Sequence, residues 1–167
     1  GALTGVLNGN LLMTTSVSIL DSASFNFTGL ANVVWNYGNI TGGGVLTNNS
    51  VLSADSVYDK SIIGETTIIN NSLIKIISSG DLNVSNGYLN NSAIGVIDMQ
   101  VYAGNISYSG SGFHQLNNAG TIKKTSSDGE AVIYCDLNNI GSLFVEQGSL
   151  KLSNLNISLN GGSYSTN

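Results

Sequence analysis

Acidic side chains are the residues of this sequence most suited to catalysis. They gather in two places, Asp55, Asp59 and Glu65 in one and Asp128 and Glu130 in the other. Two facing carboxylates about 5 to 10 Å apart could hydrolyse a glycosidic bond. However, Asp128 and Glu130 flank a single glycine, which is typical of a solvated turn, and the first group is expected on an outer face. We therefore predict neither catalysis nor metal binding at these acids.

The other reactive residue types give no catalytic set. His114 is the one histidine, which argues against a histidine-based metal site. The Ser-Gly-Ser-Gly run at residues 109–112 reads as a flexible turn, and no nucleophile elbow leads into a helix. Cys135 ends an apolar run at residues 131–135, so we expect a small buried core residue and not a reactive thiol. The sequence thus predicts no enzyme activity and no cofactor.

Charge and composition restrict the partners. The net charge is −5, and the basic residues are five lysines without arginine, so phosphate neutralisation and guanine recognition are poorly served and nucleic acid is excluded. No apolar run approaches about 18 residues and no basic amphipathic stretch occurs, so membrane insertion is not expected. Charged residues make up 9% of the chain and proline is absent, which favours an ordered domain with a neutral polar surface.

An internal repeat organises the chain. An apolar-Asn-Asn pattern recurs, and its second asparagines lie 22, 20, 27 and 21 residues apart: Asn49, Asn71, Asn91, Asn118 and Asn139. A Gly-x-apolar-x-apolar submotif follows three of these anchors, beginning at Gly80, Gly104 and Gly148. A period of this length is too short for helical-hairpin repeats of about 33–47 residues or propeller blades of about 40–50.

The alternation of apolar residues selects the architecture. Leu155, Ile157 and Leu159 alternate with polar residues, as in a half-buried strand. We predict an all-β parallel β-helix (β-solenoid) of about seven or eight coils, with two or three short strands per coil, as one domain over residues 1–167. The five second asparagines are predicted to form a structural ladder of stacked amides. Because open solenoid ends must be covered, we expect either a segment of a longer repeat protein or end-to-end pairing of copies.

The spacing of asparagine, glycine and aliphatic residues in the stretch 116–152 is similar to that of a known family. Asn-x-Gly-x-Ile and its variant Asn-x-Gly-x-Leu start at Asn118 and Asn139, and Gly-x-Leu-x-Leu follows at Gly148. This stretch resembles secreted bacterial right-handed β-helix proteins such as autotransporter passenger domains and haemagglutinin-type adhesins. Residues 46–108 match this spacing more loosely, and residues 1–34 hardly at all. The resemblance implies an extracellular or cell-surface location and an adhesive or structural role, and it transfers no catalytic motif.

Aromatic residues are the candidate binding groups. Trp35 and Tyr37 share a strand face and could stack on sugar rings if exposed, although Trp35 could instead pack inside a coil. The long interval around residues 95–115 is predicted to protrude as a loop, where specificity often resides. The candidate binding residues are Trp35, Tyr37, Tyr102, Phe113 and His114. The expected partner is a glycan or protein on a host or neighbouring cell.

Two alternatives stay open at this stage. The chain could be a self-assembling fibre or filament subunit that stacks end to end, or a polysaccharide-degrading enzyme or tailspike-type β-helix. Eight Asn-x-Ser/Thr sequons would be glycosylated only in a eukaryotic secretory pathway. They begin at Asn26, Asn39, Asn48, Asn70, Asn83, Asn90, Asn105 and Asn156.

Overall fold

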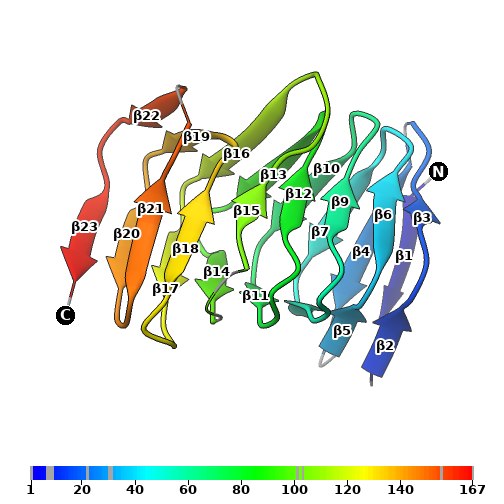
Figure 1. Ribbon diagram of the computed structural model, residues 1–167. Helices are drawn as coiled ribbons and strands as arrows, with labels where there is room; N and C mark the ends of the chain where they lie inside the picture. Colours follow the sequence, from blue (N-terminus) through cyan, green and yellow to red (C-terminus); the bar gives the residue numbers. More distant parts are fainter. Residues whose placement is uncertain are drawn as a thin grey trace.

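The computed structural model describes residues 2–6, 10–21, 23–29, 32–100, 102, 104–154 and 156–166, with backbone alone for residues 2–6. These residues form 23 short strands and no helix, and the chain winds into a solenoid of about seven turns. Each full turn contributes one strand to each of three parallel sheets (Figure 1). The predicted β-solenoid is therefore confirmed, with three strands per coil.

The sheets are named here A, B and C in the order in which each coil visits them. Sheet A consists of β1 (Ala2–Val6), β4 (Ser24–Thr28), β7 (Val45–Asn48), β10 (Thr67–Asn70), β13 (Gly87–Asn91), β16 (His114–Asn118), β19 (Asp136–Asn139) and β22 (Ile157–Leu159). Sheet B consists of β2 (Asn10–Met13), β5 (Asn32–Trp35), β8 (Val51–Ala54), β11 (Leu73–Ile76), β14 (Val96–Met99), β17 (Thr121–Lys124), β20 (Ser142–Val145) and β23 (Ser163–Thr166). Sheet C consists of β3 (Val17–Ser18), β6 (Gly38–Thr41), β9 (Lys60–Ile62), β12 (Leu82–Val84), β15 (Ile106–Ser107), β18 (Glu130–Ile133) and β21 (Ser149–Leu152).

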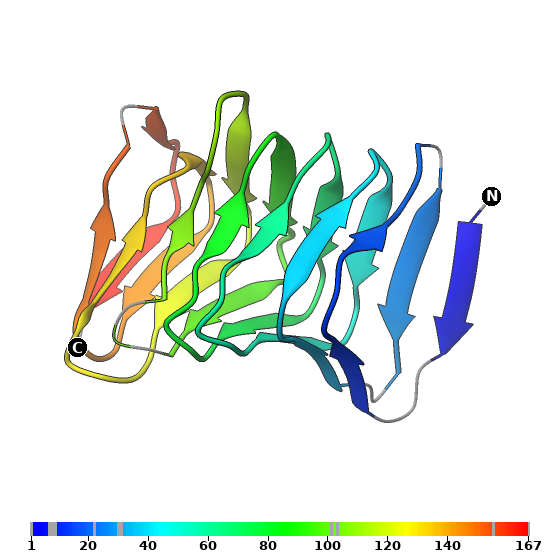
Figure 2. The same cartoon turned by 45° about the vertical axis from the view of Figure 1, so that its right-hand side comes forward.

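Apolar side chains stack from coil to coil to form the core. Figure 2 shows strands of successive coils side by side around a narrow interior. In sheet A one inward column is formed by consecutive register partners that are almost completely buried: Leu46, Ile68, Leu89, Leu116 and Leu137. Burying each such side chain contributes about 1.5–3 kcal/mol. Because strand side chains alternate between faces, the residues directly before and after each of these column members point to solvent.

A second inward column in sheet A consists of asparagines, each two residues after the apolar one. None of its members is more than 2% exposed: Asn48, Asn70, Asn91, Asn118 and Asn139. Each Nδ2 donates to the Oδ1 of the next asparagine, at 2.8, 2.7, 2.6 and 2.6 Å along the stack. The first four Nδ2 groups also donate to a carbonyl of the next coil, such as Leu73 O at 3.1 Å for Asn48. We call this column the inner amide ladder.

The five asparagines predicted to form one ladder are divided between two faces of sheet A: Asn91, Asn118 and Asn139 belong to the inner amide ladder, whereas the first two bond each other elsewhere. Asn49 and Asn71 lie outside, where Asn71 Nδ2 donates to Asn49 Oδ1 at 2.9 Å in an exposed pair. Their neighbours Asn48 and Asn70 occupy the interior instead. The reason is the period of two: inward Leu46 and Ile68 place the residue two positions later inside, and a shift of one residue reverses the face.

The same coil extends to the N-terminal region, where the repeat motif is hardly visible. β4 pairs with β7, and Phe27 is the register partner of Asn48. Phe27 is therefore buried at the position that the amide takes in later coils, with its ring edge-on to that of Phe25 at 5.1 Å. An aromatic ring replaces the amide in this coil, and so the motif disappears while the architecture continues.

The corner between sheets B and C is supported from inside by long side chains with polar ends. Trp35 Nε1 donates to Gly38 O at 3.0 Å. Lys60 Nζ donates to Ser56 O at 2.8 Å and to Tyr58 O at 2.7 Å. Lys124 Nζ likewise donates to Ser126 O and, at 3.1 Å, to Ser127 O. Burial lowers the pKa of both lysine ammonium groups, while nearby carboxylates raise it. These side chains place their polar ends on corner carbonyls, among them Ser56 O, which also accepts from Gly80 N.

Cys135 lies in the interior as predicted. It is fully buried, and burial raises the pKa of its thiol to about 12. A thiol in this state carries almost no thiolate near neutral pH, so it acts as a small apolar core residue.

We predict that Asn70→Ala destabilises the protein strongly whereas the adjacent Asn71→Ala does not. Asn70 accepts from Asn48, donates to Asn91 and donates to Val96 O, so its removal leaves buried polar groups unpaired. The expected cost is about 2 kcal/mol or more for Asn70→Ala, against about 0.5 kcal/mol or less for the partly exposed Asn71. Urea denaturation followed by circular dichroism measures both, and equal losses would contradict the register.

We further predict that N-glycosylation is incompatible with this fold at Asn48 and Asn70. Both begin sequons, and both amides are buried in the inner amide ladder. Routed through a eukaryotic secretory pathway, the chain should be retained as unfolded glycoprotein, because a glycan cannot enter the core. The double variant Ser50→Ala/Ser72→Ala removes both sequons and keeps the amides, and its yield should exceed that of the parent. A folded product with a glycan mapped to Asn48 or Asn70 by mass spectrometry would contradict this prediction.

Candidate binding surface

Four ring side chains gather where sheet C passes to sheet A, around the loop of residues 108–113. The ring of Tyr108 stacks on that of His114, with centroids 4.0 Å apart and planes 9° apart. Phe113 lies against Tyr88 of the preceding coil, with ring centroids 4.7 Å apart. We call Tyr88, Tyr108, Phe113 and His114 the aromatic corner.

The loop that carries this corner protrudes. It connects β15 to β16 and rises above the neighbouring corners (Figure 1). Gly110 at its tip has a positive φ of 80° and no heavy atom near where a side chain would begin. This loop accounts for part of the long interval that the sequence predicted to protrude at residues 95–115. The rest of that interval includes β14 and β15, which belong to the regular coil.

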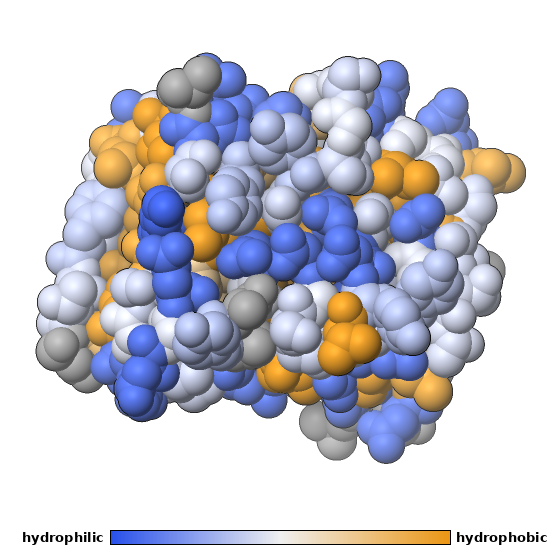
Figure 3. Space-filling model, in the orientation of Figure 1, coloured by the Kyte–Doolittle hydropathy of each residue, from blue (hydrophilic) through white to orange (hydrophobic). Residues whose placement is uncertain are grey.

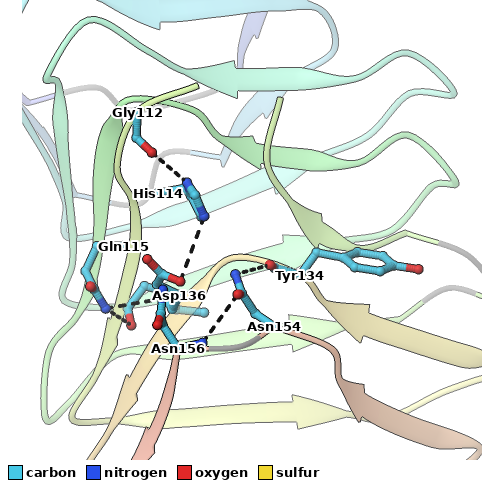
Figure 4. Close-up of polar contacts among 8 residues, drawn as sticks. Gly112, His114, Gln115, Tyr134, Asp136, Asn154 and Asn156 are labelled. Atoms are coloured by element: carbon cyan, nitrogen blue, oxygen red, sulfur yellow. Dashed lines mark hydrogen bonds and ion pairs between the residues drawn. The ribbon is translucent and has the colours of Figure 1, made fainter. Parts of the chain in front are cut away.

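His114 is held between two acceptors (Figure 4). Its Nδ1 lies 3.0 Å from Gly112 O, and its Nε2 lies 3.8 Å from Oδ1 of Asp136 in the next coil. If Nδ1–H donates to the carbonyl, a neutral ring presents an acceptor to Asp136, whereas the doubly protonated ring presents a donor. Gln115 supports the same region because its Nε2 donates to Asp136 O at 3.3 Å.

In the part of the chain that the structure describes, His114 and Asp136 contact each other and groups of the same corner. Among the described residues, no serine hydroxyl is bonded to His114, and the Tyr134 ring points away from the pair (Figure 4). Asn154 Nδ2 donates to Tyr134 O at 2.6 Å, which joins two successive coils where sheet C passes to sheet A.

The structure brings together only two of the five residues that the sequence proposed for binding. Phe113 and His114 both lie in the aromatic corner. Trp35 is 1% exposed and occupies an inward position of β5, so the alternative that it packs inside a coil is confirmed and it is not available for binding. Tyr37 is 53% exposed and packs edge-on against Tyr58. Tyr102 is 72% exposed and its ring lies over Gly129 at the corner between sheets B and C.

Tyr88 and Tyr108 also belong to the aromatic corner, although the sequence did not single them out. Tyr88 precedes the inward Leu89 by one residue, so the alternation of strand side chains would have placed it outside. Tyr88 contacts Phe113 because β13 pairs with β16. Paired residues of these two strands, such as Asn91 and Asn118, are 27 positions apart in the sequence. Because this coil is longer than its neighbours, the pairing of Tyr88 with the residues next to Phe113 could not be counted from the repeat.

The outer face of sheet A beside this corner carries a row of amides. Asn117 Nδ2 donates to Asn90 Oδ1 at 2.8 Å, and Asn138 Nδ2 donates to Asn117 Oδ1 at 3.5 Å. These three asparagines line a shallow hollow on the surface, together with Ile69 and Ile140. We call Asn90, Asn117 and Asn138 the outer amide row.

The acidic groups do not converge. Asp55 accepts from Ser78 Oγ at 2.7 Å, and Asp59 accepts from the backbone N–H of Asp81 at 2.9 Å, both at the corner between sheets B and C. Glu65 lies in a turn at the corner between sheets C and A, with a positive φ of 63°. In the described ranges, no three His, Cys, Asp or Glu side chains are grouped as metal ligands.

Asp81 continues this structural use of carboxylates. Its Oδ1 accepts from the backbone N–H and the side-chain amide of Asn105, both at 3.0 Å. Burial raises the pKa of the Asp81 carboxyl, and the hydrogen bonds from Asn105 lower it. Asp59, Asp81 and Asn105 thus cap successive coils at one corner, as Asn105 Oδ1 accepts from Val132 N at 2.9 Å.

Comparisons with protein-family models, with curated proteins and with solved structures give no match for this chain. The part of the chain that the structure describes contains no helix of the length and apolarity needed to cross a bilayer.

Proposed function

We propose that this chain is an extracellular β-solenoid scaffold that presents an adhesive surface to a glycan or protein on another cell. The observation that carries the proposal is the aromatic corner, in which Tyr88 and Phe113 form a ring pair beside a protruding loop on a rigid stack. Exposed aromatic rings offer apolar faces with polar ends, which suits sugar rings and protein surfaces alike. Loops on a rigid scaffold commonly carry recognition.

The surrounding surface supports this proposal. The chain has few charges, and neutral amides and hydroxyls dominate its polar surface. On the side that carries sheet C, hydrophilic side chains run across the middle of the molecule (Figure 3). The resemblance of residues 116–152 to secreted bacterial β-helix adhesins agrees with an adhesive role outside the cell.

The proposal is tested by screening the protein against immobilised glycans and cell-surface extracts. Phe113→Ala and Tyr88→Ala should each weaken the binding that the parent shows by about tenfold, or about 1.4 kcal/mol. Tyr37→Ala is the matched control, since it removes an exposed tyrosine at a different corner. Circular dichroism verifies that each variant keeps its fold. Loss of binding in the control equal to that in the two variants would contradict the assignment to the aromatic corner.

End-to-end self-assembly is a second candidate, and the terminal coils favour it. Apolar side chains line a hollow at the N-terminal coils, among them Leu11, Met13, Ile19 and Phe25. Another hollow at the C-terminal coils is lined by Leu143, Val145, Leu150 and Leu152. Sheets A, B and C line the N-terminal hollow and sheets B and C line the C-terminal one, so a second copy could continue the stack with its own strands.

Light scattering across a range of protein concentrations tests this candidate. If copies stack, the mass should increase with concentration, and Leu12→Lys should abolish the increase because Leu12 lines the N-terminal hollow and is 59% exposed. Val57→Lys is the control, since Val57 is 69% exposed but lies at a corner away from both ends of the stack. A single constant mass would contradict self-assembly through the ends.

A further inference from the structure

The outer amide row repeats one chemical group along the solenoid axis. Asn90, Asn117 and Asn138 are consecutive register partners on β13, β16 and β19. Neighbouring strands of a sheet lie about 4.8 Å apart, so the row presents a carboxamide at that interval. Such a periodic array matches a ligand that is itself a repeating polymer and that lies parallel to the axis.

The amides of this row have hydrogen-bonding capacity to spare. Within the row, Asn117 and Asn138 each donate once, and Asn90 and Asn117 each accept once. A carboxamide carries two N–H donors and an oxygen with two lone pairs, so each member can still bond a ligand. Sugar hydroxyls also donate and accept, which makes them complementary to such groups.

The hollow around the row is uncharged. Its remaining lining consists of small, apolar or amide residues, including Ile69, Ala119 and Ile140. Ser92 lines it as well, and its hydroxyl is buried without a hydrogen-bond partner among the described residues. The absence of ammonium and carboxylate groups from this lining disfavours a charged ligand, because ions need compensating charge when they lose water.

An aromatic pair lies beside the row. Tyr88 and Asn90 are two residues apart on the outer face of β13, and Phe113 packs against Tyr88. A sugar ring bound next to Asn90 can therefore place its apolar face on these rings while its hydroxyls reach the amides. Amides and aromatic faces side by side are the two features that recognition of a neutral sugar requires.

We infer that an uncharged, linear polysaccharide binds along the outer face of sheet A, its successive sugar hydroxyls bonded to Asn90, Asn117 and Asn138. This inference rests on the proposed adhesive function and specifies its ligand class. The inner amide ladder supplies the rigidity, because Asn91, Asn118 and Asn139 hold the adjacent backbone positions in fixed register. The ligand then meets a preorganised row and loses little affinity to ordering of the protein.

Titration with a panel of soluble uncharged polysaccharides, namely a β-glucan, a mannan and a xylan, tests this inference. Polygalacturonate of similar length serves as the charged comparison. Affinity for an uncharged member should increase with oligosaccharide length up to the span of the three amides and then level off. Asn117→Ala should reduce that affinity about tenfold, whereas Asn26→Ala, an outward asparagine of β4 on the same sheet, should leave it unchanged.

The outcomes separate this inference from the broader proposal. Glycan binding that Tyr88→Ala abolishes and Asn117→Ala leaves intact would overturn the amide row as the site, and the adhesive function would stand. Preference for polygalacturonate would overturn the uncharged ligand class. Absence of binding to every uncharged member of the panel would overturn the inference altogether.

Discussion

Hydrogen bonds between buried asparagine amides of successive coils are the interaction on which the rest of this structure depends. An unpaired carboxamide in an apolar interior costs about 1–3 kcal/mol, so each inner asparagine is stable only opposite another one. The apolar columns beside the ladder contribute more to the free energy of folding. They do not fix the register of the strands, because Leu, Ile and Val can replace one another there with little loss of stability. The amides therefore act as the register device of sheet A, and Tyr164 Oη accepts from the last of them at 3.1 Å.

This inner register determines the chemistry of the outer surface. Because strand side chains alternate, fixing Asn91, Asn118 and Asn139 inside places Asn90, Asn117 and Asn138 outside at the same spacing. The insertion in the coil between Asn91 and Asn118 is then accommodated at the corners and does not shift the sheet. Part of that extra length forms the loop that brings Phe113 and His114 beside Tyr88 and Tyr108. One buried column thus positions both the amide row and the aromatic corner.

The sequence was informative about architecture and poor at assigning faces. Period-two alternation and the recurring Asn-Asn pairs are local signals, so the solenoid and its repeat could be predicted. Choosing between the two asparagines of a pair requires the register from the preceding apolar residue. Counting from Ile68 instead of Ile69 identifies Asn70 as the inner one. Trp35 could not be placed in this way because Val33 and Val34 before it are both apolar, so alternation leaves the inward face undecided until β5 pairs with β8. The meeting of Tyr88 with Phe113 likewise depends on pairing between coils of unequal length.

The inner asparagines are expected to be energetically coupled through their direct hydrogen bonds. A double-mutant cycle on Asn91 and Asn118, whose amides are joined at 2.6 Å, measures this coupling from the free energies of unfolding of the parent, both alanine variants and the double variant. The account predicts that the second substitution costs less once the first is present, with a coupling of about 1 kcal/mol or more. Costs that add without coupling would contradict the ladder as the interaction that sets the register.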